Sequence, residues 1–291
     1  MNHRSTLAVT AAALGTAALV AAGGLAYALR PDPATEVPAL ATTEPATDTQ
    51  LREAAGTKVF FAHQSVGRDV LGSLPAMFED RGVAAPPIIE SHEPLDREGG
   101  YLEQWNIGVN GDPMGKIEEF DHFVRAGIGE NAEVVVLKFC FLDITAAHDV
   151  DAVLRSYTTM LDALARDHPD VAVVAATVPV THERPLEWRA KALIGRDDGH
   201  APENNIARER FNDALRERYA GPGELLDLAS VMATTSDGVR HERTHDGSVY
   251  FTLEPQWARD PAHLNEAGGS FGAEVLMRTV AEARESGGIG G

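Results

Sequence analysis

The chain has 291 residues, with 44 acidic against 25 basic side chains and a formal net charge of −19. Nucleic-acid binding and attachment to anionic lipid both need clustered lysine or arginine, so this charge argues against both kinds of partner. The only cysteine, Cys140, excludes an internal disulfide, and the length suits one domain once the N-terminus is set aside.

The first thirty residues differ in composition from the rest. Arg4 precedes an uncharged apolar run over residues 7–29. A basic start followed by an apolar core is typical of an export signal, and the Ala-Tyr-Ala at 26–28 resembles a cleavage site. The run also reaches the ~20 residues that span a bilayer as a helix. Residues 1–30 therefore predict a cleaved signal peptide or a retained membrane anchor, with the domain outside the cytoplasm and membrane contact through this segment only.

A spacer and then alternating strands and helices follow. Residues 31–56 are rich in Pro, Thr, Ala and acidic residues, which predicts a flexible linker. Within a domain over 57–286, apolar runs predict strands at 58–62, 87–90, 133–141, 171–178 and 224–229. Helical spacing predicts helices at 69–80, 113–126, 150–167, 204–219 and 265–283. Residues 234–256 predict a hairpin or loop, and residues 287–291 a disordered tail.

The strands are apolar throughout, and most are followed by a helix. This pattern predicts a parallel sheet covered on both faces, that is, a three-layer α/β/α sandwich with about five strands. Ligands of such sheets bind beyond the carboxyl ends of the strands. The residues directly after each strand are therefore the candidates for a functional site.

Ser65 follows the first predicted strand and precedes a helix. Its hydroxyl is expected at the carboxyl edge of the sheet, with its own N–H placed to face an oxyanion; an ordinary helix N-cap is the structural alternative. Asp260 and His263 lie three positions apart before the last helix. A carboxylate so placed can fix the imidazole tautomer, so that the other ring nitrogen accepts a proton from serine. A helix cap and a surface histidine are the structural alternative for this pair.

Three blocks, in this order, resemble the SGNH or GDSL hydrolases. They are HQSVG at 63–67, in the place of the family's Gly-Asp-Ser, then WNIGVNGD at 105–112, then Asp260-x-x-His263. The resemblance spans about residues 58–283 and implies a flavodoxin-like strand order. It also implies Ser65 as nucleophile, Asp260 and His263 as the rest of the triad, and the N–H groups of Ser65 and Gly111 as oxyanion donors. It implies no metal and no organic cofactor.

Two departures from the family pattern concern the oxyanion hole. The HQSVG block lacks the usual Gly-Asp, and Leu142 stands where the third block has an asparagine. Leucine has no side-chain donor, and losing one such donor typically costs about 10²–10³ in rate. We expect the Gln64 or Asn110 side-chain amide to replace it. Lys138 is less favoured, because strand alternation turns it away and a buried ammonium is costly to desolvate.

The resemblance implies a serine esterase without a cofactor, and the predicted export signal indicates a substrate outside the cell. Its substrate would be a small-molecule or glycan ester, such as an O-acylated cell-surface glycan or a lipid ester. The same triad would also serve an O-acyltransferase, and the missing asparagine also fits a catalytically silent carbohydrate-binding relative. The sequence specifies no oligomeric state.

Three further features have simpler interpretations. HERTH at 241–245 matches the zinc-peptidase pattern, which works only on a helix, whereas flanking Asp-Gly pairs predict a polar hairpin. GGSFG at 268–272 matches a nucleophile elbow but lacks a preceding strand and a following histidine, so its glycines are predicted to permit close packing. Cys140 lies in an apolar run and is predicted to be a core residue.

Overall fold

The computed structural model describes residues 30–192 and 199–290. The signal or anchor predicted for residues 1–30 falls, apart from Arg30, outside this described part. Within the described part, no helix combines the length and the apolar character needed to cross a membrane.

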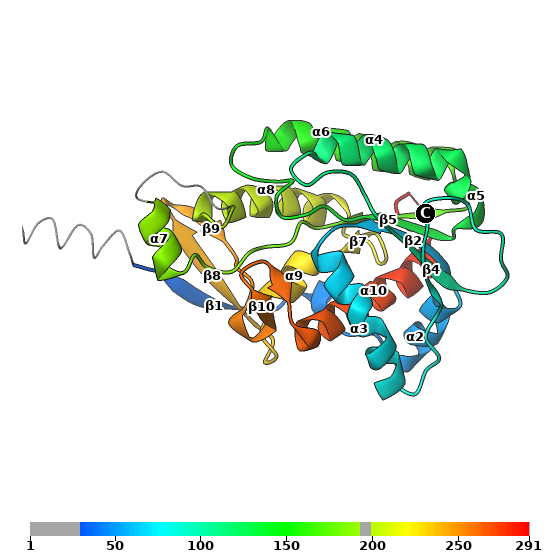
Figure 1. Cartoon of the computed structure of the whole chain (residues 1–291), viewed down its shortest axis with the longest axis horizontal. Helices are drawn as coiled ribbons and strands as arrows, with labels where there is room; N and C mark the ends of the chain where they lie inside the picture. The colour runs from blue at the N-terminus through cyan, green and yellow to red at the C-terminus, as the bar shows by residue number, and fades with distance from the viewer. Residues whose placement is uncertain (1–29, 193–198, 291) are drawn as a thin grey trace, which may run out of the picture.

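Six parallel strands form the central sheet of the described residues (Figure 1). In chain order they are β2 (Lys58–His63), β3 (Ile88–Glu90), β4 (Tyr101–Asn106), β5 (Val134–Leu137), β6 (Ala172–Ala176) and β7 (Leu225–Leu226). They lie side by side in the order β3-β4-β2-β5-β6-β7, and every neighbouring pair is parallel. Without the short edge strand β3, this is the flavodoxin-like order. The predicted fold class is confirmed, with six strands in place of about five.

Helices cover both faces of the sheet (Figure 1). One face packs against α2 (Asp48–Ala55), α3 (Val66–Asp80), α9 (Leu228–Ala233) and α10 (Glu266–Ser286). The other packs against α4 (Pro113–Phe123), α6 (Val150–Asp167) and α8 (Pro202–Arg218). Successive side chains of a strand point to opposite faces, so Phe61 enters the first core and Phe60 the second. Shorter helical segments are α5 (Gly129–Asn131), which follows a π-helical turn at Val124–Ile128, and α7 (Leu186–Ala192).

Residues 31–56 are not the flexible linker that the composition predicts. β1 (Ala34–Pro38) pairs antiparallel with β8 (Val239–His245), and β9 (Ser248–Tyr250) completes this small sheet. Helix α2 begins at a capping box in which Thr47 and Gln50 exchange hydrogen bonds. Leu51 is fully buried in the first core. The segment is ordered because it has its own cap and its own apolar contact.

The C-terminal residues also differ from the disordered tail that was predicted. The Ile289 N–H donates to the Val173 carbonyl at 3.0 Å, and the Ile289 side chain is buried in the second core. A main-chain bond and an apolar side chain therefore fix the chain up to residue 290.

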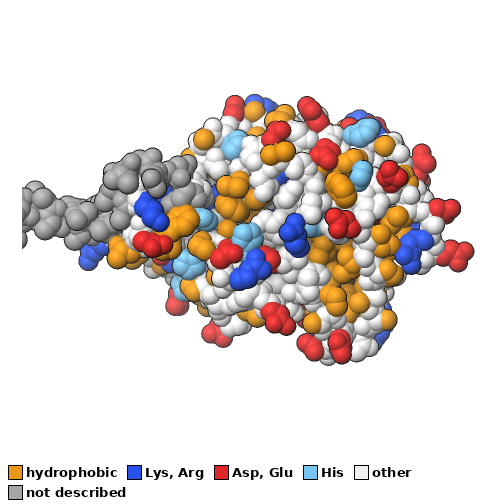
Figure 2. Space-filling view, viewed as in Figure 1, with side chains coloured by type: hydrophobic (Ala, Val, Ile, Leu, Met, Phe, Trp, Pro, Cys, Tyr) orange, Lys and Arg blue, Asp and Glu red, His pale blue; other side chains and the backbone are white. Residues whose placement is uncertain are grey.

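The surface reflects the acidic composition. Figure 2 shows Asp and Glu side chains distributed over the visible face, with Lys and Arg side chains lying singly among them. No continuous basic patch is present among the described residues on this face.

Candidate active site

The loops at the carboxyl ends of four neighbouring strands form the candidate site. Ser65 follows β2, residues 107–112 follow β4, residues 138–143 follow β5, and residues 177–182 follow β6. A short hairpin of β10 (Ala258–Asp260) and β11 (His263–Leu264) joins them. The His182 N–H donates to the Pro261 carbonyl at 2.7 Å, which ties this hairpin to the loop after β6.

Ser65 occupies a strained turn between strand β2 and helix α3. Its φ of 53° and ψ of −106° lie outside the conformations that non-glycine residues usually adopt. Such strain costs about 1–3 kcal/mol and persists where the surroundings impose it. In the nucleophile elbow of other hydrolases, a strained turn between a strand and a helix exposes the serine in the same way. Ser65 stands at the helix N-cap position, but its side chain makes no capping bond, so the simple N-cap interpretation does not hold.

His63 and Gly67 make this tight turn possible. A β-carbon on Gly67 would lie 2.6 Å from the His63 side chain, so only glycine fits there. The His63 Nε2 lies 3.0 Å from the Gln104 Oε1, which can only accept, so this nitrogen bears the proton. Burial, reinforced by the nearby Lys138, lowers the pKa of His63 to about 3. His63 is therefore a neutral structural residue at physiological pH.

The structure brings Ser65, His263 and Asp260 together. The Ser65 Oγ lies 2.5 Å from the His263 Nε2. The His263 Nδ1 lies 2.8 and 2.9 Å from the two carboxylate oxygens of Asp260. Burial acts to raise the Asp260 pKa, but bonds from the Ala262 N–H and the His263 ring outweigh it and hold that pKa below its usual range. Asp260 therefore stays ionised and keeps the ring proton on Nδ1, which leaves Nε2 free to accept from serine.

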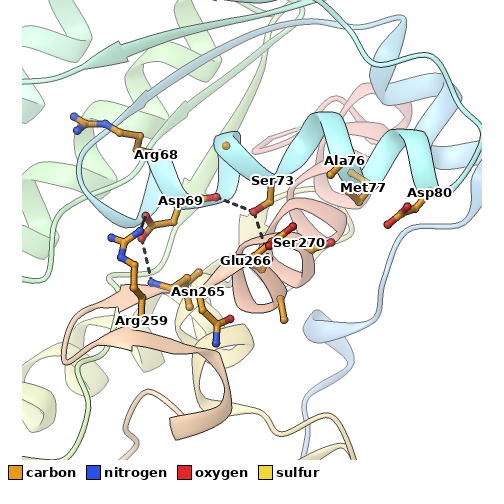
Figure 3. A pocket seen from close by; sticks show the side chains of 13 residues that line it. Arg68, Asp69, Ser73, Ala76, Met77, Asp80, Arg259, Asn265, Glu266 and Ser270 are labelled. Atoms are coloured by element: carbon orange, nitrogen blue, oxygen red, sulfur yellow. Dashed lines mark hydrogen bonds and ion pairs between the residues drawn. The ribbon is translucent and has the colours of Figure 1, made fainter.

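Helix α3 also holds the histidine in place. Asp69, in its first turn, accepts the Leu264 N–H at 3.1 Å and pairs with Arg259 at 2.9 Å (Figure 3). Leu264 directly follows His263, so this bond ties the backbone beside His263 to the helix that begins beside Ser65. The sequence gives no signal for this role of Asp69, because the residue resembles an ordinary acidic residue at a helix N-terminus.

The Gly111 N–H does not fit the oxyanion role predicted for it. It already donates to the Asp143 Oδ1 at 2.7 Å. The other Asp143 oxygen accepts from the Lys116 ammonium and from the Cys140 N–H, both at 2.6 Å. Lys116 and Asp143 are fully buried. This pair fastens the loops after β4 and β5 together, so the Gly111 N–H is structural.

The Gln64 side chain is also unavailable as an oxyanion donor. Its Nε2 donates to the Ile107 carbonyl at 2.8 Å and to the Gly108 carbonyl at 3.2 Å, which uses both amide hydrogens. Two of the predicted donors remain. The Ser65 N–H has no acceptor among the described residues. Asn110 uses its Oδ1 to accept from Lys116 at 2.9 Å, and its exposed side chain keeps a free amide NH₂ in the described part of the chain.

A cleft of about 870 Å³ adjoins these residues, between α3 and the start of α10 (Figure 3). Its lining includes Arg68, three residues after Ser65, and Leu264, next to His263. Small-molecule sites commonly occupy clefts of this size. Ser65, Asp260 and His263 do not line this cleft, so it is a neighbouring groove along α3 and not the catalytic site itself.

The HERTH segment forms a strand, as its flanking turns predict. Residues 239–245 make up β8, which turns at Asp246-Gly247 into β9. The His241 Nδ1 contacts Glu254 at 2.8 Å, and the His245 Nδ1 contacts Asp32 at 3.0 Å. Each imidazole therefore has its own carboxylate partner. Within the described residues, no three side chains of His, Cys, Asp or Glu are grouped as metal ligands.

We therefore expect the esterase activity that the sequence predicts to be unchanged by dialysis against EDTA. The reason is that strand geometry separates His241 and His245, whereas the zinc pattern needs both on one helical face. The measurement compares kcat before and after dialysis, with and without added zinc. Activity lost to EDTA and restored by zinc would contradict the predicted serine nucleophile and favour the zinc-peptidase pattern.

The other two features are structural, as predicted. Residues 268–272 lie inside α10, and a β-carbon on Gly269 would come within 2.3 Å of the Ser73 hydroxyl on α3. These glycines therefore let the two helices pack closely. Cys140 is 1% exposed and belongs to a small apolar cluster.

No protein-family model and no curated protein sequence matches the chain. Similar solved structures include the C-terminal catalytic domain of peptidoglycan O-acetyltransferase A from Streptococcus pneumoniae, at 12% identity and a TM-score of 0.41, covering 79% of this chain and 96% of that chain. The periplasmic domain of a lipopolysaccharide acetyltransferase from Salmonella ser. Paratyphi A has 12% identity and a TM-score of 0.41, covering 80% and 88%. A member of the lipolytic G-D-S-L family from Veillonella parvula has 11% identity and a TM-score of 0.40, covering 75% and 95%.

Proposed function

We propose that the protein is a serine ester hydrolase in which Ser65 is the nucleophile. The observation that supports this most is the continuous chain of short contacts from the Ser65 Oγ through the His263 ring to the Asp260 carboxylate. In the proposed reaction His263 takes the serine proton while Oγ attacks the ester carbonyl. The protonated ring then gives this proton to the leaving alcohol, and water releases the acyl group by the same steps in reverse.

The strained turn favours this role over a passive serine. A serine at φ 53° that makes no capping bond stabilises neither the helix nor the turn. Strain of this kind is typical of residues whose exposure serves a function. The Ser65 N–H is the main oxyanion donor in this proposal, because it lies in the same turn and has no acceptor among the described residues.

Labelling with a fluorophosphonate, followed by mapping of the modified residue, tests the nucleophile. We expect modification at Ser65 and hydrolysis of p-nitrophenyl acetate, and a catalytically silent binding protein would show neither. A series of p-nitrophenyl esters of rising chain length then defines the acyl group. Product analysis with and without an acceptor sugar separates hydrolysis from acyl transfer.

We further propose that the domain works outside the cytoplasm, because of the apolar run at residues 7–29.

Replacing Asn110 with alanine is expected to lower kcat by about 10²-fold with little change in KM. An amide that donates mainly to the developing oxyanion contributes in the transition state and not in substrate binding. Steady-state kinetics on a neutral ester measures both constants. Met114→Ala, an exposed position in the neighbouring helix α4, is the matched control. An unchanged kcat in Asn110→Ala would mean that backbone donors alone form the oxyanion hole.

A further inference from the structure

Lys138 is a buried lysine directly after strand β5. Its side chain is 0% exposed, and its ammonium donates to the backbone carbonyl of Gln64 at 2.7 Å. No other hydrogen bond and no ion pair of this ammonium occurs within the described part of the chain. A buried charge without a paired carboxylate is costly, so its position calls for a physical reason.

The groups around Lys138 do not neutralise it. Its nearest carboxylate on the same loop, Asp143, is already bonded to Lys116 and to two backbone N–H groups. Asp69 on α3 acts on Lys138 only at longer range. The Asp69 carboxylate is bonded to Arg259 and to the Leu264 N–H.

The remaining neighbours act in opposite directions and do not outweigh burial. Cys140, on the same loop, favours the charged form of Lys138, whereas Lys116 on α4 disfavours it because it has the same sign of charge. His63 on β2 is neutral, since burial and the Lys138 charge lower its pKa to about 3. The ammonium therefore leaves a positive field directed at the Gln64 carbonyl.

The Gln64 carbonyl belongs to the same peptide group as the Ser65 N–H. A cation bound to the oxygen of a peptide favours the resonance form with a positive nitrogen, which makes its N–H a stronger donor. We propose that Lys138 polarises the Gln64–Ser65 peptide and so strengthens the Ser65 N–H as oxyanion donor, in place of the side-chain amide absent at Leu142. This inference rests on the proposed function. Lys138 is a positioning residue, because it acts on the reacting atoms through this peptide.

The polarisation of the Gln64–Ser65 peptide depends on the charge of Lys138 and not on its hydrogen bond alone. Burial lowers the pKa of Lys138 from its ordinary value to about 8. Below this pH the ammonium polarises the peptide; above it the neutral amine still donates to Gln64 but no longer contributes a charge. The kcat for ester hydrolysis is therefore expected to fall as the pH rises through about 8.

The test measures kcat and KM for a neutral p-nitrophenyl ester from about pH 6 to about pH 10, on both sides of this pKa. In Lys138→Met we expect kcat at pH 7 to fall by about 10- to 100-fold, with KM little changed. This fall should not exceed the fall in kcat that removal of a direct oxyanion donor causes. The alkaline fall seen in the wild type should be absent. Lys58→Met, at the amino end of β2 on the opposite edge of the sheet, should keep the wild-type profile.

Three results would overturn the inference about Lys138 without affecting the proposed function. They are a wild-type kcat that stays level through pH 8–10, an unchanged kcat in Lys138→Met, or an alkaline fall that persists in that variant. A level wild-type profile overturns the inference even if the variant does not fold. Folding of the variant is expected, because removing an unpaired buried charge should leave its melting temperature equal or higher. If wild-type Ser65 neither reacts with a fluorophosphonate nor cleaves an ester, the proposed function fails instead.

Discussion

Replacing Ser65 with alanine is expected to lower kcat for ester hydrolysis by about 10⁶-fold while the domain stays folded, because the attacking atom is lost. The hydroxyl contacts only the His263 ring and makes no helix cap, so its removal costs no structural bond. Alanine keeps the β-carbon of serine and therefore adds no backbone strain at this φ. The contacts of the Gln64–Ser65 peptide should persist as well.

Ester hydrolysis, fluorophosphonate labelling and thermal unfolding should be measured on the same preparations. Ser156→Ala is the matched control, because Ser156 lies on α6, on the opposite face of the sheet from α3. It should hydrolyse esters and take the label like the wild type. Residual activity of Ser65→Ala within about tenfold of the wild type would show that another group attacks the ester.

The positions of Ser65, Asp260 and His263 could be predicted because their signals are local. A serine between an apolar strand and a helix lies at the carboxyl edge of a parallel sheet whatever the rest of the chain does. The Asp-x-x-His spacing brings a carboxylate to an imidazole within a single turn, and the Asp260 Oδ1 also accepts the His263 N–H at 3.0 Å. Only the distance between Ser65 and His263 depends on the whole fold.

Two of the predicted oxyanion donors, the Gly111 N–H and the Gln64 amide, proved to be occupied, because long-range contacts decide which donors are free. The Gly111 N–H is occupied by Asp143, which is 32 residues away in sequence. Gln64 is occupied by two carbonyls of the loop after β4. Sequence spacing shows that a donor lies near the nucleophile but not whether another group has already taken its hydrogen.

The elements that the sequence does not predict correctly, β4, α2 and the end of β5, contain polar residues that find hydrogen-bond partners inside the protein. β4 was not predicted because Glu103 and Gln104 interrupt its apolar pattern, yet Gln104 lies in the sheet to orient His63. The capping box at Thr47 and Gln50 was a local signal for α2 that the Pro- and Thr-rich composition obscured. β5 ends at Leu137, short of the predicted residue 141, because Lys138 and the following residues form the loop that contacts Gln64 and Asp143.

Replacing Asp260 with asparagine is expected to lower kcat by about 10⁴-fold at neutral pH, through the wrong histidine tautomer. The Asp260 Oδ1 accepts the N–H groups of Ala262 and His263 at 3.0 Å, so the single oxygen of asparagine should stay on these two donors. The amide nitrogen then takes the place of Oδ2, 2.9 Å from the His263 Nδ1, and competes there with the retained oxygen at 2.8 Å, which already accepts two backbone N–H groups. An NH₂ group there donates to Nδ1 and shifts the ring proton to Nε2, which can no longer accept from Ser65.

Asp260→Ala separates this effect from the loss of a negative charge. Alanine also removes the carboxylate but offers no donor to Nδ1, so the His263 ring can still take the productive tautomer part of the time. Because the Asp260 side chain is 42% exposed, water can replace its bonds to the backbone. We therefore expect Asp260→Ala to keep more activity than Asp260→Asn, as measured by kcat for the same ester at the same pH. Equal losses in the two variants would show that the carboxylate acts through its charge, and that the tautomer is fixed by other contacts.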